Sequence, residues 1–173
     1  MKKITLIFVL LLLPLAAHSQ GLESVYSDLS AKSCKTVQTD KETGDTTQLC
    51  PGIAGYKLKV YDSDLRQSIG VMDPSGKEQH LDYYHAISAN FSSLGPKAEW
   101  RVDKKDGKLV PRALIVRVNA SENPDKPDQK TSYLAVAKLG PETCVTAKIP
   151  PSKDMNEAAQ QSADQAANKP CLK

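Results

Sequence analysis

Apolar and polar residues alternate most regularly near the middle of the chain, over residues 97–118. In residues 98–102, three apolar side chains alternate with Glu99 and Arg101, which is the two-residue period of a half-buried strand. Asp106-Gly107 follows, a dipeptide favoured in tight hairpins because both central residues need positive φ. The return stretch, residues 113–118, is apolar on both faces. We therefore expect it in the middle of a sheet that is covered on both sides.

Other stretches have the composition of strands and are separated by turn residues. They are residues 34–38, 46–50, 56–60, 65–71, 131–138 and 143–149. Residues 20–33 have weak periodicity, and we interpret them as an extended lead-in. These segments predict a sheet whose neighbouring strands are joined by short turns.

Apolar residues at spacings of three and four predict two helices. A short mid-chain helix is expected from the series Leu81, Tyr84, Ile87, Phe91 and Leu94, with Asp82 as its N-cap and Gly95-Pro96 as its end. Near the C-terminus, Asp154 and Glu157 have the spacing of a capping box. The stripe of this second helix is mostly alanine and buries little area, so a frayed tail is the alternative.

These elements predict an α+β fold. It consists of a mainly antiparallel sheet of about seven or eight strands, a short mid-chain helix and a C-terminal helix. No internal repeat or linker divides the chain.

The first 19 residues have the pattern of a secretory signal peptide. A basic start precedes an apolar run, and Ala17 and Ser19 are the small residues that a signal peptidase reads, so we predict a signal peptide at 1–19 and a single disulfide-bonded domain at 20–173. The alternative is an uncleaved anchor, but the run is short for a membrane span. Removing Lys2 and Lys3 lowers the formal net charge from +3 to +1. We expect a periplasmic or secreted protein with no membrane span after cleavage and no nucleic-acid partner.

The four cysteines all lie in the predicted mature chain. An even number in an exported chain predicts two disulfides, and three pairings are open. Spacing favours Cys34–Cys50, across a probable hairpin, and Cys144–Cys171, which would attach the tail to the sheet. No C-x-x-C pair indicates a redox or metal site.

Candidate catalytic groups are few. His80 and His85 are five residues apart, a weak spacing for a metal site even with Asp82 between them. Asp62 and Asp64 would be paired carboxylates, but aspartates in turns more often bond their own backbone. No nucleophile motif, phosphate loop or calcium loop is present. We predict no enzyme activity, no cofactor and no metal.

A candidate binding surface is predicted from outward-facing polar and aromatic residues. Glu99 and Arg101 face away from Trp100, and we expect them to pair across the sheet with Arg117 or Asp103, or to meet a partner. Tyr83 is expected to point outward, because its neighbour Tyr84 is on the apolar face of the predicted helix. The candidate binding residues are therefore Glu99, Arg101, Arg117 and Tyr83.

Several short stretches of the chain resemble one family. They are Cys50-Pro51-Gly52 with Gly55-Tyr56, residues 64–68, residues 92–101 and residues 114–119. Together they are similar to a family of small exported proteobacterial proteins with no assigned activity. The resemblance implies secretion and a disulfide-bonded domain, and it implies no catalytic residue.

The leading functional hypothesis is a non-enzymatic module that binds a periplasmic protein or another envelope component. The alternative is a hydrolase, or a hydrolase inhibitor, that acts on the cell wall through Asp62, Asp64 or residues 80–85. A cleft in which two carboxylates converge would favour the enzyme. An exposed apolar patch would favour the binder, and a purely structural envelope protein is a third reading. The sequence leaves the partner and the oligomeric state open.

Overall fold

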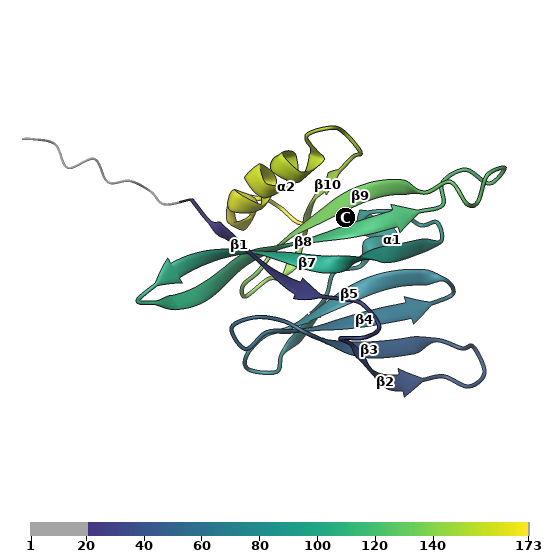
Figure 1. The fold of residues 1–173 in the computed structure, drawn as a ribbon, viewed down its shortest axis with the longest axis horizontal. Helices are drawn as coiled ribbons and strands as arrows, with labels where there is room; N and C mark the ends of the chain where they lie inside the picture. The colour runs from purple at the N-terminus through teal and green to yellow at the C-terminus, as the bar shows by residue number, and fades with distance from the viewer. Residues whose placement is uncertain (1–20, 173) are drawn as a thin grey trace, which may run out of the picture.

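A computed structural model describes residues 21–172, so the predicted signal peptide lies outside the described residues (Figure 1). The strands are β1 (Glu23–Asp28), β2 (Lys35–Thr39), β3 (Thr46–Pro51), β4 (Lys57–Ser63), β5 (Arg66–Met72), β6 (Glu78–His80), β7 (Ser92–Lys105), β8 (Lys108–Ala120), β9 (Thr131–Lys138) and β10 (Cys144–Ile149). The helices are α1 (Tyr83–Ala86), α2 (Met155–Asp164) and the 3₁₀ turn η1 (Ala166–Asn168). Within residues 21–172, no helix has both the length and the apolar character to cross a membrane.

The strands form one ten-stranded sheet with the order β10-β9-β8-β7-β5-β4-β3-β2, while β1 pairs with β7 and β6 with β5. The prediction of a sheet-rich α+β fold is confirmed, but the count of seven or eight strands was too low. The lead-in contains β1, and the short β6 had no apolar pattern to reveal it. The sheet is also mixed, because β5 and β7 run parallel where Arg66 meets Ser92.

The central hairpin formed by β7 and β8 is confirmed. Asp106 and Gly107 have φ of 51° and 74°, as a tight turn requires. β8 lies between β7 and β9, and both of its faces are buried. Its Leu114, Val116 and Val118 belong to one apolar cluster, whereas Ala113 and Ile115 belong to another.

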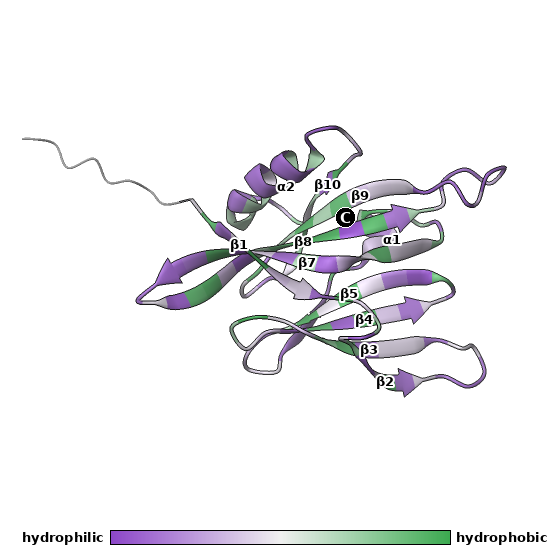
Figure 2. Ribbon diagram, viewed as in Figure 1, coloured by the Kyte–Doolittle hydropathy of each residue, from purple (hydrophilic) through white to green (hydrophobic). Residues whose placement is uncertain are grey.

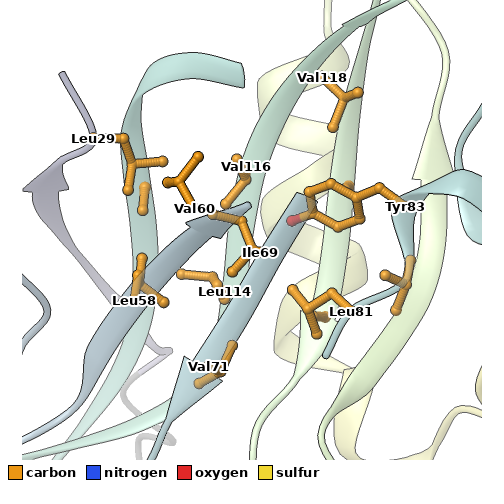
Figure 3. Packing of buried hydrophobic residues seen from close by; sticks show 14 of the residues in the cluster. Leu29, Leu58, Val60, Ile69, Val71, Leu81, Tyr83, Leu114, Val116 and Val118 are labelled. Atoms are coloured by element: carbon orange, nitrogen blue, oxygen red, sulfur yellow. The ribbon is translucent and has the colours of Figure 1, made fainter. Parts of the chain in front are cut away.

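The sheet bends where a single residue pair joins β5 to β7, so that its two halves form two layers. Buried side chains from both halves pack in one core between these layers (Figure 3). Leu58 and Ile69 of β4 and β5 pack in the same cluster as Trp100 and Leu114 of β7 and β8. Trp100 is fully buried, and its indole N–H donates to the Ser27 hydroxyl of β1 at 2.9 Å. The core therefore depends on residues from both halves of the sheet.

Helix α2 covers the outer face of β8 and β9 (Figure 1). Its Met155, Ala159 and Ala163 pack on Ile115 and Val136, while most of the residues along the helix are hydrophilic (Figure 2). The C-terminal helix is thus confirmed and docked, although Asp154 makes no side-chain capping bond.

The predicted mid-chain helix over residues 81–94 is largely wrong. Only Tyr83–Ala86 is helical, with Asp82 as the expected N-cap. Gly95-Pro96 does not end a helix but lies within β7, at an irregularity between Leu94 and Ala98. Pairing of Ser92 with Ala120 draws this segment into the sheet, and that long-range contact overrides the local spacing.

Both predicted disulfides are present. Cys34–Cys50 joins the segment before β2 to β3, and Cys144–Cys171 ties the C-terminal tail to β10. The Leu172 amide also donates to the Val145 carbonyl at 2.8 Å. The tail therefore covers the outer edge of β10.

Candidate functional site

Three of the four predicted binding residues lie on the outer face of the sheet beside α2. Glu99 and Arg101 come from β7 and Arg117 from β8. The strand alternation that buries Trp100 on the inner face places all three side chains on the opposite face. Helix α2 also lies on this face, as expected from the apolar residues on both sides of the 113–118 strand.

Arg101 is buried, with 8% of its surface exposed, and its partner differs from those predicted. Its Nε donates to Asp164 Oδ1 at 2.7 Å and its Nη2 to Oδ2 at 2.9 Å, so a carboxylate at the end of α2 binds it with both oxygens. The same guanidinium reaches the Ser24 hydroxyl and the Leu22 carbonyl. The hydrogen bonds that Arg101 donates to the Asp164 carboxylate raise the pKa of Arg101. The expected pairing with Asp103 is wrong, because Asp103 pairs with Arg112.

Glu99 lies next to this ion pair and accepts hydrogen bonds from neutral groups. The Ser24 hydroxyl donates to its Oε1 at 2.5 Å, and the Gln160 amide of α2 donates at 2.7 Å. Tyr26 is opposite Glu99 in the β1–β7 register. Burial raises the pKa of the Tyr26 phenol, and the charge of Glu99 raises it further.

Arg117 is held at the other end of α2. Its guanidinium donates to Ser132 Oγ at 3.1 Å and to Asn156 Oδ1 at 3.4 Å, and it lies 3.6 Å from Met155 Sδ. A Cβ on Gly95 would come within 2.8 Å of the Arg117 Cβ, so the glycine allows the arginine stem to cross the neighbouring strand. These contacts fix the direction of the Arg117 side chain.

A cleft of about 280 Å³ opens between the flank of α2 and the strands β1, β7 and β8. Ile115 and Leu134 form its apolar floor. Its polar lining consists of Tyr26, Lys97, Glu99, Arg117, Asn156 and Gln160. We call this hollow the α2 cleft.

Tyr83, the fourth predicted binding residue, is not on this surface. It is buried with 2% exposed, and burial raises the pKa of its phenol. Its neighbour Tyr84 is the one that faces solvent, with 49% exposed. The prediction was wrong because the segment is one helical turn rather than the longer helix from which the two faces were assigned.

A second surface, missed by the sequence reasoning, surrounds Arg66. The Arg66 guanidinium lies 4.7 Å from the centre of the Phe91 ring and 5.9 Å from that of Tyr84. Leu65 precedes it at the tip of the β4–β5 hairpin and is 69% exposed. We call Leu65, Arg66, Tyr84 and Phe91 the Arg66 surface.

The Arg66 surface is held rigidly by backbone contacts. Arg66 Nε donates to the Ala89 carbonyl and its Nη1 to the Asp64 carbonyl, both at 2.9 Å. The Leu65 carbonyl accepts from the Ser92 amide at 2.9 Å. Hollows of about 360 Å³ adjoin it on two sides, between Leu65, Phe91 and the loop that follows β8.

The candidate catalytic residues do not gather at one point. Asp64 forms an ion pair with Arg66, whereas Asp62 accepts from the Gln67 amide at 2.8 Å, and the two carboxylates line different hollows. His85 contacts the Asp82 carboxylate at 2.7 Å on the helical turn. His80 instead stacks on Tyr61 at 4.8 Å.

One group of side chains has ligand atoms close enough for a metal. Glu142, Cys144 and Cys171 place such atoms within 4.8 Å of one another. The two sulfurs are bonded to each other, so they are not thiolates and do not bind a metal in this form.

These features define a disulfide-bonded α+β domain with two layers of sheet, a docked C-terminal helix and two separate surface sites. Comparisons with protein-family models, curated proteins and solved structures found no match for this chain. The function of this protein is therefore inferred from the two surfaces themselves.

Proposed function

We propose that this protein is an exported, non-enzymatic binding module that docks a protein of the cell envelope on the Arg66 surface. Export is inferred from the signal-peptide pattern of residues 1–19. Two disulfides are compatible with an oxidising compartment. The observation that carries the proposal is the pair of exposed aromatic rings beside the Arg66 guanidinium, with the exposed Leu65 next to them.

The composition of the Arg66 surface supports docking. Tyrosine and arginine are enriched among the residues that dominate binding energy at protein interfaces. Single exposed apolar residues are ordinary, but Tyr84 and Phe91 lie beside one partly neutralised guanidinium, and Leu65 lines a hollow with Phe91. Such a patch offers an apolar contact with a polar centre.

The backbone of the hairpin tip supports the same conclusion. Asp64 and Leu65 both have positive φ, 49° and 58°. A bulky residue is rare in this conformation, and glycine would adopt it at less cost. Unfavourable backbone geometry is concentrated at functional sites, and here it presents a leucine to solvent.

The test is affinity capture from an envelope extract by the mature protein, compared with Leu65→Gly, Phe91→Ser and the control Val37→Ser. Val37 is 50% exposed on β2, so its loss removes apolar surface outside the Arg66 surface. We expect one protein to be retained by wild type and the control, and to bind at least 10-fold more weakly to both site variants.

Leu65→Gly also separates binding from folding. It removes the side chain but relieves the positive φ, so its thermal stability should equal or exceed that of wild type. Equal capture by all four proteins, or capture of nothing by wild type, would contradict the proposal.

A further inference from the structure

The α2 cleft contains charges of both signs, and none of them forms a salt bridge with another described residue. Glu99 is half-buried and accepts hydrogen bonds from the neutral side chains of Ser24 and Gln160. Among the described residues, no cation lies within salt-bridge distance of its carboxylate. The nearby Arg101 is already bound by Asp164.

The two cations of the cleft, Arg117 and Lys97, likewise form no salt bridge with a described residue. Arg117 donates to the neutral atoms of Ser132 and Asn156. The Lys97 ammonium lies 5.9 Å from the centre of the Tyr26 ring. Within residues 21–172, neither cation has a carboxylate within salt-bridge distance.

The fold keeps these opposite charges apart. Glu99 is directly opposite Ile115 across the β7–β8 ladder, which places Arg117 one diagonal step away. Gly95 leaves room for the arginine stem, and the guanidinium donates to Asn156 at the start of α2 rather than to Glu99. Partly desolvated charges of opposite sign normally pair, so their separation across a hollow leaves both ready for an external ligand.

The rest of the cleft indicates a small ligand with an apolar part. Its volume of about 280 Å³ is just below the range for drug-sized ligands. Ile115 and Leu134, 3% and 5% exposed, form the floor, and the Tyr26 ring stands at the margin. Asn156 and Gln160, one helical turn apart on α2, add amide groups along one wall.

We propose that the α2 cleft binds a small zwitterion of the amino-acid or short-peptide class. The ligand's ammonium binds Glu99, its carboxylate binds Arg117 and Lys97, and its apolar side chain lies on Ile115 and Leu134. This site is separate from the Arg66 surface and does not depend on the function proposed for it.

The test is a titration of the mature protein with L-alanyl-L-alanine, followed by calorimetry and by amide chemical shifts. Two blocked probes, N-acetyl-L-alanyl-L-alanine and L-alanyl-L-alanine amide, lack the ammonium and the carboxylate respectively. We expect the free dipeptide to bind and each blocked form to bind at least 10-fold more weakly, with shifts centred on the α2 cleft.

Variants that remove one charge identify which residue binds the ammonium of the dipeptide and which residues bind its carboxylate. Glu99→Gln keeps an acceptor for Ser24 and Gln160. It should weaken binding of the free dipeptide at least 10-fold and leave binding of the N-acetyl form unchanged. Arg117→Gln and Lys97→Gln should weaken binding of the free dipeptide and leave binding of the dipeptide amide unchanged. Lys97 is exposed, so its variant keeps the test valid if Arg117→Gln disturbs the fold.

The matched controls are Glu42→Gln and Lys105→Gln, exposed charges outside the cleft. Both should bind the dipeptide as wild type does. The inference is overturned if millimolar dipeptide causes no shift in the cleft, if blocked and free probes bind equally, or if either blocked probe binds more tightly than the zwitterion.

Discussion

At the residue scale, the burial of Arg101 shows how one charge organises the face of the sheet beneath α2. Its guanidinium joins the end of α2, through Asp164, to the start of the described chain, through Ser24 and Leu22. Burying a charge costs free energy unless all of its hydrogen-bonding groups have partners, so the loss of any one of these contacts should weaken the whole arrangement. Arg101 supports the α2 cleft rather than facing a ligand.

Replacing Arg101 with methionine should lower the free energy of unfolding by about 2 kcal/mol, because Asp164 would lose both of its charge-assisted bonds while one-third exposed. Urea denaturation measures the change. The matched control is Arg112→Met, whose ion pair with Asp103 is about half exposed and should contribute less than about 0.5 kcal/mol. Equal effects of the two substitutions would show that the Arg101 pair adds no special stability.

Glu78 should make stability depend on pH. Burial alone would raise the pKa of Glu78, but hydrogen bonds from Lys59 and Tyr61 hold it below its ordinary value. A lowered folded pKa stabilises the protein above the unfolded pKa near 4.5, and this stability is lost as pH falls through the folded pKa. Glu78→Gln should therefore cost about 1 kcal/mol at pH 7 and less at pH 3.

Urea denaturation of Glu78→Gln at the two pH values tests this linkage. The exposed Glu42→Gln should have little effect at either pH. A difference between wild type and Glu78→Gln that stays constant from pH 7 to pH 3 would mean that the ionisation of Glu78 is not coupled to folding.

Which face of a strand a residue occupies was predictable from the sequence, but its partner was not. Alternation placed Glu99 and Arg101 correctly on the face opposite Trp100. The partner Asp164 is 63 residues away on a helix whose docking has no local signature. The predicted burial of Tyr83 and Tyr84 was reversed for a related reason. A helical period was assigned to a segment that contains only one turn of helix.

At the scale of elements, α2 is attached by small side chains and by a covalent tether. Its contacts to the sheet come largely from Ala159, Ala163 and Met155. Alanines bury little apolar area each, so their packing stabilises the helix only modestly. Cys171 follows η1 and fixes the tail to β10. The helix and its disulfide were both predictable from the sequence, because helical spacing and cysteines are local signals, although the expected capping bond of Asp154 is not formed.

Removing the Cys144–Cys171 bond should release α2 selectively. We expect Cys144→Ser with Cys171→Ser to lower stability by about 3 kcal/mol and to abolish amide-exchange protection in α2. The matched control, Cys34→Ser with Cys50→Ser, opens a similar loop and should cost a similar amount while α2 stays protected. Retained protection of α2 in the first variant would show that alanine packing alone holds the helix.

At the scale of the whole molecule, the sheet is one hydrogen-bonded ladder with a weak point. Among residues 21–172, the strand pairing between the β5 side and the β7 side consists of the Arg66–Ser92 pair alone. The sequence predicted the strands on both sides but not this bend, because nothing local specifies which distant strands meet. The bend also creates the Arg66 surface, since it brings the β4–β5 tip beside Phe91. That surface was missed for the same physical reason.

Because one residue pair joins the two halves of the sheet, strand pairing alone would allow them to unfold separately. We expect them to unfold together, because they share one core. Ile69 of β5 is fully buried in the cluster that contains Trp100, whose ring lies 5.8 Å from that of Tyr56. Ile69→Ala should cost about 3 kcal/mol and shift the Trp100 fluorescence and far-UV circular dichroism transitions together. The exposed Val37→Ala should shift neither by much. If Ile69→Ala moves only one of the two transitions, each half of the sheet has a core of its own, and the bend is a hinge between them.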